Sequence, residues 1–152
     1  SEAGYSLVSS AIRNKMRLIS IVLGTASSKA RIDGSQALLD YGYRFFSTET
    51  LFRANEEIIN AKTWKAENDS TSIGIADDLT ITLPKGASKR LVYENNLPDI
   101  IEGPIISKQK IGSVSIKLDD EVINTVPLVA LENNPSGGIL KQIQDTIQLW
   151  FE

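Results

Sequence analysis

The hydrophobic pattern divides the first part of the chain into two apolar runs and one periodic segment. The apolar runs cover residues 5–12 and 17–23, and the polar pair Asn14-Lys15 between them is the expected turn. Such runs are typical of adjacent antiparallel strands covered on both faces. A polar stretch over residues 25–33 predicts a loop, and Leu and Phe spaced seven apart over residues 35–46 predict a helix. Because a hairpin with one helix is marginal in water, we expect this region to need further partners.

Between about residues 50 and 132 the pattern changes to short alternating segments. Turn residues such as Asn68-Asp69, Pro84-Lys85-Gly86 and Asp119-Asp120 separate them. Short strands at this spacing are typical of a small β-sandwich. The expected strands cover residues 58–61, 63–66, 72–75, 79–83, 90–94, 112–118 and 126–131.

The last segment follows a stretch at residues 133–138 whose composition is that of a flexible linker. Its apolar residues recur at helical spacing, which predicts an amphipathic helix able to lie in a lipid interface. The alternative is a helix docked on its own sandwich or on a partner, because the polar face carries a single Lys and lacks the usual basic bias. The candidate membrane-binding residues are Ile139, Leu140, Ile143, Ile147, Trp150 and Phe151.

Composition narrows the chemistry that is open to the chain. Of its 152 residues 41% are apolar, enough to bury a core, and it contains no His and no Cys. Catalytic arrangements that need His or Cys, disulfides and the commonest metal ligands are therefore excluded, and we expect no metal and no cofactor. The net charge of −3 argues against a nucleic-acid partner.

Two patterns come close to catalytic signatures. Ser107-Lys108-Gln109-Lys110 fits S-x-x-K, in which an amine takes the proton of the serine hydroxyl. That pairing needs a helix, and this stretch has the context of a turn or strand. The carboxylate clusters Glu56-Glu57, Asp77-Asp78 and Asp119-Asp120-Glu121 place neighbours on opposite faces of extended chain. We assign no catalytic residue from these patterns.

Several segments resemble one known family. Residues 3–11, Ala-Gly-Tyr-Ser-Leu-Val-Ser-Ser-Ala, and residues 16–24 are similar to the last strands of the serine D-alanyl-D-alanine carboxypeptidases, the low-molecular-mass penicillin-binding proteins of bacteria. Residues 37–46 resemble the family's L-L-x-[WY]-G-[FY]-R-F-F helix. Residues 79–86 and 126–131 are similar to its C-terminal sandwich, and the last helix resembles its membrane anchor. The resemblance covers essentially the whole chain in order.

The resemblance implies an α+β fragment of a longer protein. Two antiparallel strands and a helix would come from a penicillin-binding catalytic domain, followed by a small all-β sandwich and a C-terminal amphipathic helix. The expected parts are residues 1–48, the C-terminal remnant of the catalytic domain, residues 49–132, the β-sandwich domain, and residues 133–152, the linker and membrane-anchor helix.

The resemblance also implies an activity that the chain alone lacks. The family's helical S-x-x-K, its S-x-N and its K-T-G would all lie before Ser1, so no catalytic residue is expected in this chain. Arg31 matches a basic residue that the family places in a loop beside the cleft, where it could meet a peptide carboxylate through paired hydrogen bonds. Without the family, Arg31 is interpreted as a solvated loop charge.

The implied parent is a periplasmic enzyme, peripheral on the outer face of the inner membrane. It would remove the terminal D-Ala from peptidoglycan pentapeptides through a serine acyl-enzyme. Its expected partners are the missing N-terminal catalytic portion, the pentapeptide, β-lactams and the inner-membrane surface. The alternative, of another class, is a non-enzymatic sandwich module that binds cell-wall polymer or a partner protein.

Overall fold

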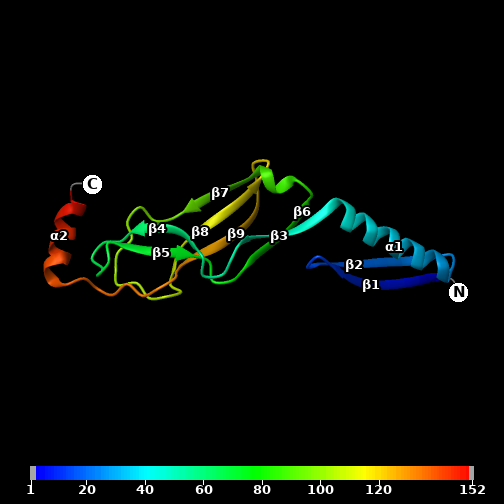
Figure 1. Ribbon diagram of the computed structural model, residues 1–152, viewed down its shortest axis with the longest axis horizontal. Coiled ribbons are helices and arrows are strands. Elements are labelled where there is room, and N and C mark those ends of the chain that lie inside the picture. The colour runs from blue at the N-terminus through cyan, green and yellow to red at the C-terminus, as the bar shows by residue number, and fades with distance from the viewer. Residues whose placement is uncertain (1–2, 151–152) are drawn as a thin grey trace. The chain divides into compact units, whose positions relative to one another are not determined.

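A computed structural model describes residues 3–150 of the chain (Figure 1). The chain folds into two compact units. The first extends to Glu49 and also includes Thr80–Lys89, and the second comprises Thr50–Leu79 and the chain from Arg90 onward. The first unit therefore takes in a segment from within the range that the sequence assigns to the sandwich.

The first unit begins with a two-stranded antiparallel hairpin. Strand β1 (Tyr5–Arg13) pairs with strand β2 (Met16–Thr25). The turn residues Asn14 and Lys15 have φ of 50° and 65°, the left-handed pair that a tight two-residue hairpin turn requires. The predicted strands and their turn are present.

Helix α1 (Ser28–Phe45) begins earlier than predicted. Ser27 caps it, since the Ser27 Oγ accepts a hydrogen bond from a first-turn backbone N–H at 3.1 Å. Lys29 and Asp33 form an exposed ion pair at 2.7 Å one turn apart. The loop predicted over residues 25–33 is therefore wrong, because most of those polar residues form the solvent-facing start of a helix.

Small residues let α1 pack closely on the hairpin. Ser35 is buried, its Oγ lies 2.5 Å from the Ser9 Oγ, and it accepts a hydrogen bond from the Ser20 Oγ at 3.0 Å. A Cβ at Gly42 would lie 2.4 Å from the Leu18 Cδ1, so a larger residue there would require the Leu18 side chain to shift. The hydroxyl cluster at Ser35 and the glycine at position 42 thus accompany the close packing of the helix on the strands.

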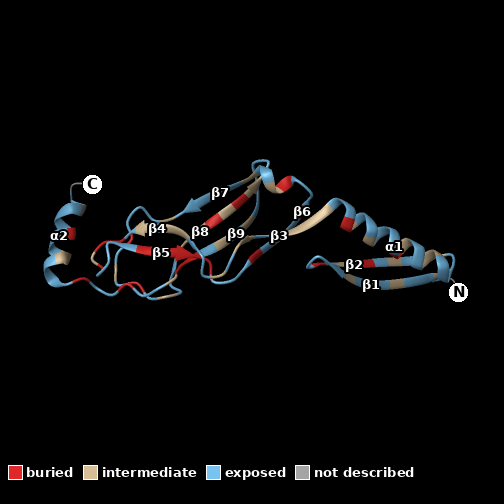
Figure 2. Ribbon diagram, in the orientation of Figure 1, coloured by how far each residue is buried: buried red, intermediate tan, exposed pale blue. Residues whose placement is uncertain are grey.

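The other faces of this unit are apolar and uncovered. On α1, Leu38 and Phe45 are exposed. Along both hairpin strands, exposed residues alternate with more buried ones over most of their length (Figure 2). The expectation that this region needs further partners stays a prediction. The exposed apolar residues of the hairpin face are Val8, Ile12, Ile19, Ile21 and Leu23.

The second unit is built on a five-stranded antiparallel sheet of order β4-β5-β9-β8-β7. Strand β3 (Phe46–Phe52) pairs with β6 (Leu79–Pro84) in a separate ladder. Residues 80–84 of β6 belong to the first unit, as does most of the short helix η1 (Ala87–Arg90) that follows. The predicted all-β architecture of this region is confirmed. The sheet strands are β4 (Glu57–Lys62), β5 (Ser70–Gly74), β7 (Leu91–Asn96), β8 (Lys110–Leu118) and β9 (Glu121–Ala130).

The core of this unit lies on one face of the sheet. Ile73, Ile105, Val114, Ile116 and Leu128 are almost completely buried there (Figure 2). These side chains come from three central strands and from the loop after β7, so the loop closes the core that the sheet cannot cover alone.

One predicted strand is absent, and one observed strand was not predicted. Residues 63–66 form no strand, because Lys65 has a φ of 59°, outside the extended region. Strand β3 was missed, since it begins directly after α1 with no Gly or Pro between them. The hairpin turn predicted at Asp119-Asp120 is present, with φ of 51° and 67°.

Candidate functional site

Helix α2 (Ile139–Leu149) lies beside the loop that follows β4 (Figure 1). The Asp145 Oδ2 accepts a hydrogen bond from the Lys65 backbone N–H at 2.7 Å, and Asp145 is only 7% exposed. The Lys65 carbonyl accepts a hydrogen bond from the Gly137 N–H at 2.8 Å. Because Lys65 leaves the extended conformation, both of its backbone groups are available to the helix segment.

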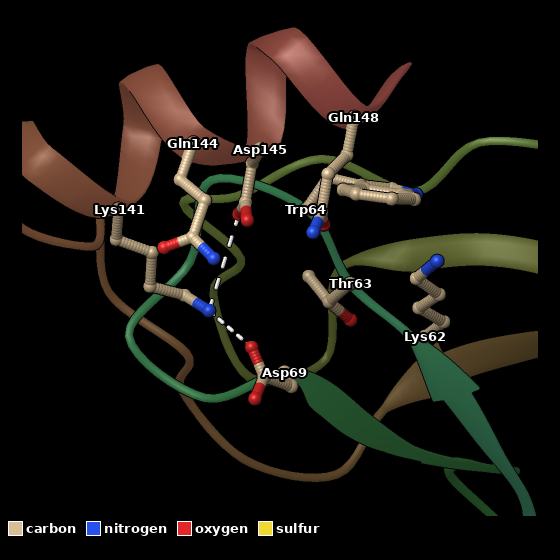
Figure 3. A pocket seen from close by; sticks show the side chains of 8 residues that line it. All are labelled: Lys62, Thr63, Trp64, Asp69, Lys141, Gln144, Asp145 and Gln148. Carbon is tan, nitrogen blue, oxygen red and sulfur yellow. Dashed lines mark hydrogen bonds and ion pairs between the residues drawn. The ribbon is translucent and has the colours of Figure 1, made fainter. Parts of the chain in front are cut away.

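A second contact joins the same two elements. The Lys141 Nζ donates a hydrogen bond to the Asp69 Oδ1 and lies 3.9 Å from the Asp145 Oδ2 (Figure 3). The hydrogen bond and the charge of Lys141 hold the pKa of the Asp69 carboxyl below its ordinary value of 3.8. The same bond raises the pKa of the Lys141 ammonium above 10.5, against an opposing effect of desolvation.

The segment before α2 is also tied to the sandwich. Asn134 is buried, and its amide donates to the Asn68 carbonyl at 3.0 Å and to the Thr71 Oγ1 at 2.9 Å. The Glu67 N–H donates to the Pro135 carbonyl at 2.7 Å. A stretch with the composition of a flexible linker therefore makes several hydrogen bonds with the loop after β4.

A cleft of about 660 Å³ lies between α2 and the sandwich (Figure 3). The Lys62 Nζ lies 3.7 Å from the centre of the Trp64 ring, and Trp64 is buried. The ring is therefore a packed part of the wall and offers no open face to a ligand. Apart from these residues the cleft is lined by Thr63, Asp69, Lys141, Gln144, Asp145 and Gln148.

The polar face of α2 points at the sandwich, so its apolar face points away. Ile139 and Leu140 are 78% and 84% exposed, and Trp150 just after the helix is 86% exposed. Ile143 and Ile147 are exposed as well, while Phe151 lies outside the described residues. Within residues 3–150 no helix has the length and hydrophobicity to cross a bilayer. What the structure presents is an apolar strip on a helix of three turns.

Arg31 lies in the first turns of α1, so its predicted position in a loop is wrong. The Arg31 Nη1 donates to the Ser6 carbonyl at 2.9 Å, and the Nη2 donates to the Ser28 Oγ at 3.3 Å. The guanidinium carbon lies 5.7 Å from the centre of the Tyr5 ring. The Nε–H is enclosed and has no partner among the described residues. Arg31 thus ties the start of α1 to β1 and keeps one donor unused.

The S-x-x-K stretch has no catalytic geometry. Ser107 lies in a turn, and the next residue, Lys108, has a φ of 67°. The Ser107 Oγ donates to the Leu131 carbonyl at 3.1 Å, and Lys110 is the first residue of β8. Serine and lysine therefore do not share a helix face.

The carboxylate clusters serve local structure. The Asp78 Oδ1 accepts a hydrogen bond from the Ala54 N–H at 2.8 Å, and Asp119 forms an ion pair with Arg90 at 2.7 Å. Over residues 3–150 no three acidic side chains gather in a way that could hold a metal ion. The clusters thus stabilise turns at the surface.

Sequence reasoning missed Lys65, Asp69 and Asp145 as members of one site. The sequence places Asp145 on the polar face of a helix and Asp69 in a turn, but it does not pair them with their partners. The Lys65–Asp145 bond joins residues 80 positions apart. The sequence held one sign of this site. Asp145 is the single acidic residue of the short last helix, and its neighbours in the chain are Gln144 and Thr146.

Comparison with known proteins shows which proteins this chain is similar to. Residues 46–136 match the family described as "Penicillin-binding protein 5, C-terminal domain". The chain is 36% identical over 152 residues to the D-alanyl-D-alanine carboxypeptidase DacA of Escherichia coli K12, and 31% identical to DacC of the same strain. These alignments cover 99% and 98% of the chain, which spans 38% of the length of each relative.

Solved structures show the same fold. Penicillin binding protein 5 from Haemophilus influenzae matches with a TM-score of 0.78 and 32% identity, over 88% of this chain and 40% of that one. The D-alanyl-D-alanine carboxypeptidase DacD from Francisella tularensis matches with a TM-score of 0.64 and 31% identity, over 88% of this chain and 34% of that one. The described fold is therefore one that these carboxypeptidases share.

Proposed function

Because the chain belongs to the penicillin-binding protein 5 family, whose C-terminal domain it contains, we propose that it is the C-terminal part of a D-alanyl-D-alanine carboxypeptidase bound to a membrane surface. The observation that carries the membrane role is the outward apolar face of α2. Ile139, Leu140, Ile143 and Ile147 are all more than half exposed on a helix whose polar side is occupied by the sandwich.

The driving force for membrane binding is hydrophobic. Each aliphatic side chain contributes about 1.5–3 kcal/mol on full burial, and insertion at an interface is partial. Lys141, the one cation of the helix, is already paired with Asp69. Anionic lipid and salt should therefore have little effect on binding. Trp150 suits the headgroup depth, where its ring is apolar and its N–H stays in contact with water.

The whole protein would act as the relatives' names say, as a carboxypeptidase. It would be periplasmic, peripheral on the outer face of the inner membrane, and would release the terminal D-Ala of peptidoglycan pentapeptides through a serine acyl-enzyme. In this proposal the first unit packs against an N-terminal catalytic portion, which covers the exposed apolar face that includes Ile19 and Ile21. The sandwich spaces the active site from the membrane, and the parent's β-lactam binding belongs to that catalytic portion.

Arg31 is proposed as a contact for the substrate carboxylate in the complete enzyme. Its position matches a basic residue of the family, and the hydrogen bonds that its Nη1 and Nη2 groups make to Ser6 and Ser28 are exposed. Arg31→Gln in the full-length protein should raise KM for a peptide ending in D-Ala-D-Ala more than it lowers kcat. An unchanged KM would mean that Arg31 has only a structural role, through its hydrogen bonds with Ser6 and Ser28.

The alternative of a sandwich that binds cell-wall polymer has no support in the described cleft. Sugar rings stack on exposed aromatic faces, and the aromatic residue of this cleft, Trp64, is 4% exposed and covered by Lys62. A glycan would have to displace that packing. The carboxypeptidase proposal is therefore the one we carry forward.

Vesicle co-sedimentation tests the membrane role. The 152-residue chain should pellet with phosphatidylcholine vesicles, and a chain that ends at Pro135 should not. A matched control is Gln144→Ala, which leaves the apolar strip intact and should pellet like the original chain. Equal pelleting of the full and shortened chains, or binding abolished by moderate salt, would show that the hydrophobic strip is not the anchor.

A further inference from the structure

Helix α2 is poorly equipped to form without help. It spans 11 residues, has no side-chain hydrogen bond at its N-cap Gly138, and carries neither an acidic residue in its first turn nor a basic one in its last. Isolated helices shorter than about 12–15 residues are marginal in water even in favourable sequences. Three Ile and one Thr lower its intrinsic preference further. The helix therefore depends on contacts with the rest of the protein.

Two of the contacts that hold α2 and the chain entering it meet at one backbone position. Lys65 donates its N–H to Asp145 and accepts the N–H of Gly137 at its carbonyl, so it binds both the helix and the chain entering it. The carboxylate of Asp145 makes a charge-assisted bond, which is stronger than a neutral one. A cleft lies beside this bond, so α2 is not packed against the sandwich along its whole polar face.

We propose that Asp145 holds α2 on the sandwich as a preformed helix, so that lipid meets an apolar face that is already folded. The proposal rests on the membrane role proposed above. An interfacial helix that forms only on contact with lipid loses part of its binding free energy to ordering of the backbone. Here the bond to Lys65 orders the helix beforehand, with Ile139 and Leu140 turned outward.

Replacement of Asp145 by Ala separates this mechanism from local helix preference. Ala has the highest helix propensity and Asp one of the lower ones. If local preference governs α2, Asp145→Ala should stabilise the helix, and if docking governs it, the same change should loosen the helix. Thr146→Ala is the matched control, because Thr146 is exposed and its hydroxyl bonds only within the helix, to the Gln142 carbonyl.

Amide hydrogen exchange of the 152-residue chain without lipid gives the readout. In Asp145→Ala the amides of residues 142–149 should exchange about tenfold to a hundredfold faster, which is the effect of one hydrogen bond to a charged group. In Thr146→Ala they should exchange at the original rate or more slowly. Amides of β8 should be unchanged in both variants, which shows that the sandwich is intact. Unchanged or slower exchange of α2 in Asp145→Ala would overturn the proposal.

Two further measurements keep the result interpretable. Asp145→Asn keeps the size and one acceptor oxygen, so its α2 amides should exchange at a rate between the original chain and Asp145→Ala, even if the Ala variant proves unstable. Binding to phosphatidylcholine vesicles should weaken several-fold in Asp145→Ala. If the original chain does not bind vesicles but α2 loosens in Asp145→Ala, the membrane role fails and the docking by Asp145 stands. If vesicle binding is normal and α2 exchange is unaffected, docking by Asp145 fails and the membrane role stands.

Discussion

Gly42 of α1 and Leu18 of β2 approach so closely that a Cβ on the glycine would lie 2.4 Å from the Leu18 Cδ1. A residue larger than glycine at this position would require the Leu18 side chain to move. Gly34, two turns earlier on the same helix, has only ordinary contacts, with the nearest Val22 methyl at 3.6 Å from its ideal Cβ. The two glycines therefore offer a matched pair for measuring close packing.

Gly42→Ala should destabilise the first unit relative to Gly34→Ala. Overpacking costs about 1–3 kcal/mol, while replacement of a helical Gly by Ala gains about 1 kcal/mol at both positions. Gly34→Ala should therefore be neutral or stabilising. Urea unfolding followed through α1 amides measures the difference. Equal stabilities would mean that the Leu18 side chain moves aside at no cost.

The uncovered hairpin face should make the chain self-associate. Val8 lies opposite Ile21 in the strand register, and both are at least 60% exposed. At about 25 cal/mol per Å² of apolar area, a contact of a few hundred Å² contributes several kcal/mol. Sedimentation velocity should show a concentration-dependent larger species that Ile21→Asp removes. Val122→Asp, at an exposed position on β9, should leave association unchanged. A chain that stays monomeric at all concentrations would contradict this prediction.

Acid should weaken the Lys141–Asp69 contact that helps to hold α2. The lowered pKa of Asp69 means that the pair stabilises the folded chain above the ordinary carboxyl pKa, and that this contribution is lost as pH falls through the lowered value. The raised pKa of Lys141 means that its contribution is complete below 10.5 and is lost as pH rises through the raised value. We expect the pair to act between about pH 4 and about pH 10.5.

NMR chemical shifts of the amides of residues 141–145 against pH measure this effect. Two other charged residues lie near this pair. The Asp145 carboxylate is 3.9 Å from the Lys141 ammonium, and the charge of Lys62 also lowers the pKa of Asp69. Both residues are left unchanged in the variant used for comparison. Asp69→Asn removes the titrating carboxyl and should flatten the acidic limb of the curve. The same curve in the variant would assign the transition to another group.

Penicillin should not acylate this chain. Ser107 donates its hydroxyl proton to the Leu131 carbonyl and shares no helix face with Lys110, so no activated serine is present in the S-x-x-K stretch. Incubation with a fluorescent penicillin and gel imaging should give no labelled band. Full-length penicillin binding protein 5 from Haemophilus influenzae serves as the positive control. A covalent adduct at Ser107 would show that this assignment is wrong.

Local sequence was sufficient wherever one residue or one short pattern decides the structure. Asn14-Lys15 and Asp119-Asp120 were predicted as hairpin turns, and both pairs adopt the left-handed conformation that such turns need. The alternation of short apolar segments indicated the all-β region for the same reason, because strand periodicity is a local property. The rejection of Ser107–Lys110 as catalytic also followed from local context.

The sequence failed where polarity alone was read as the absence of structure. Ser28, Lys29 and Asp33 are polar residues that face solvent on the first turns of α1, and the Ser27 cap is what marks this stretch as the start of a helix. The strand predicted at residues 63–66 does not form because Lys65 has a positive φ. Lysine rarely adopts that conformation, so the residue type gives no indication of it.

By itself the sequence determined most of the elements, the apolar strip of residues 139–150 and the family resemblance. Only the tertiary structure decided which way that strip points. A helical pattern has two faces, and nothing within it says which one is docked. The bond between Asp145 and Lys65, 80 residues apart, turns the polar face inward and the apolar face outward. A contact of this kind forms only once the sandwich has placed Lys65, so no local pattern can encode it.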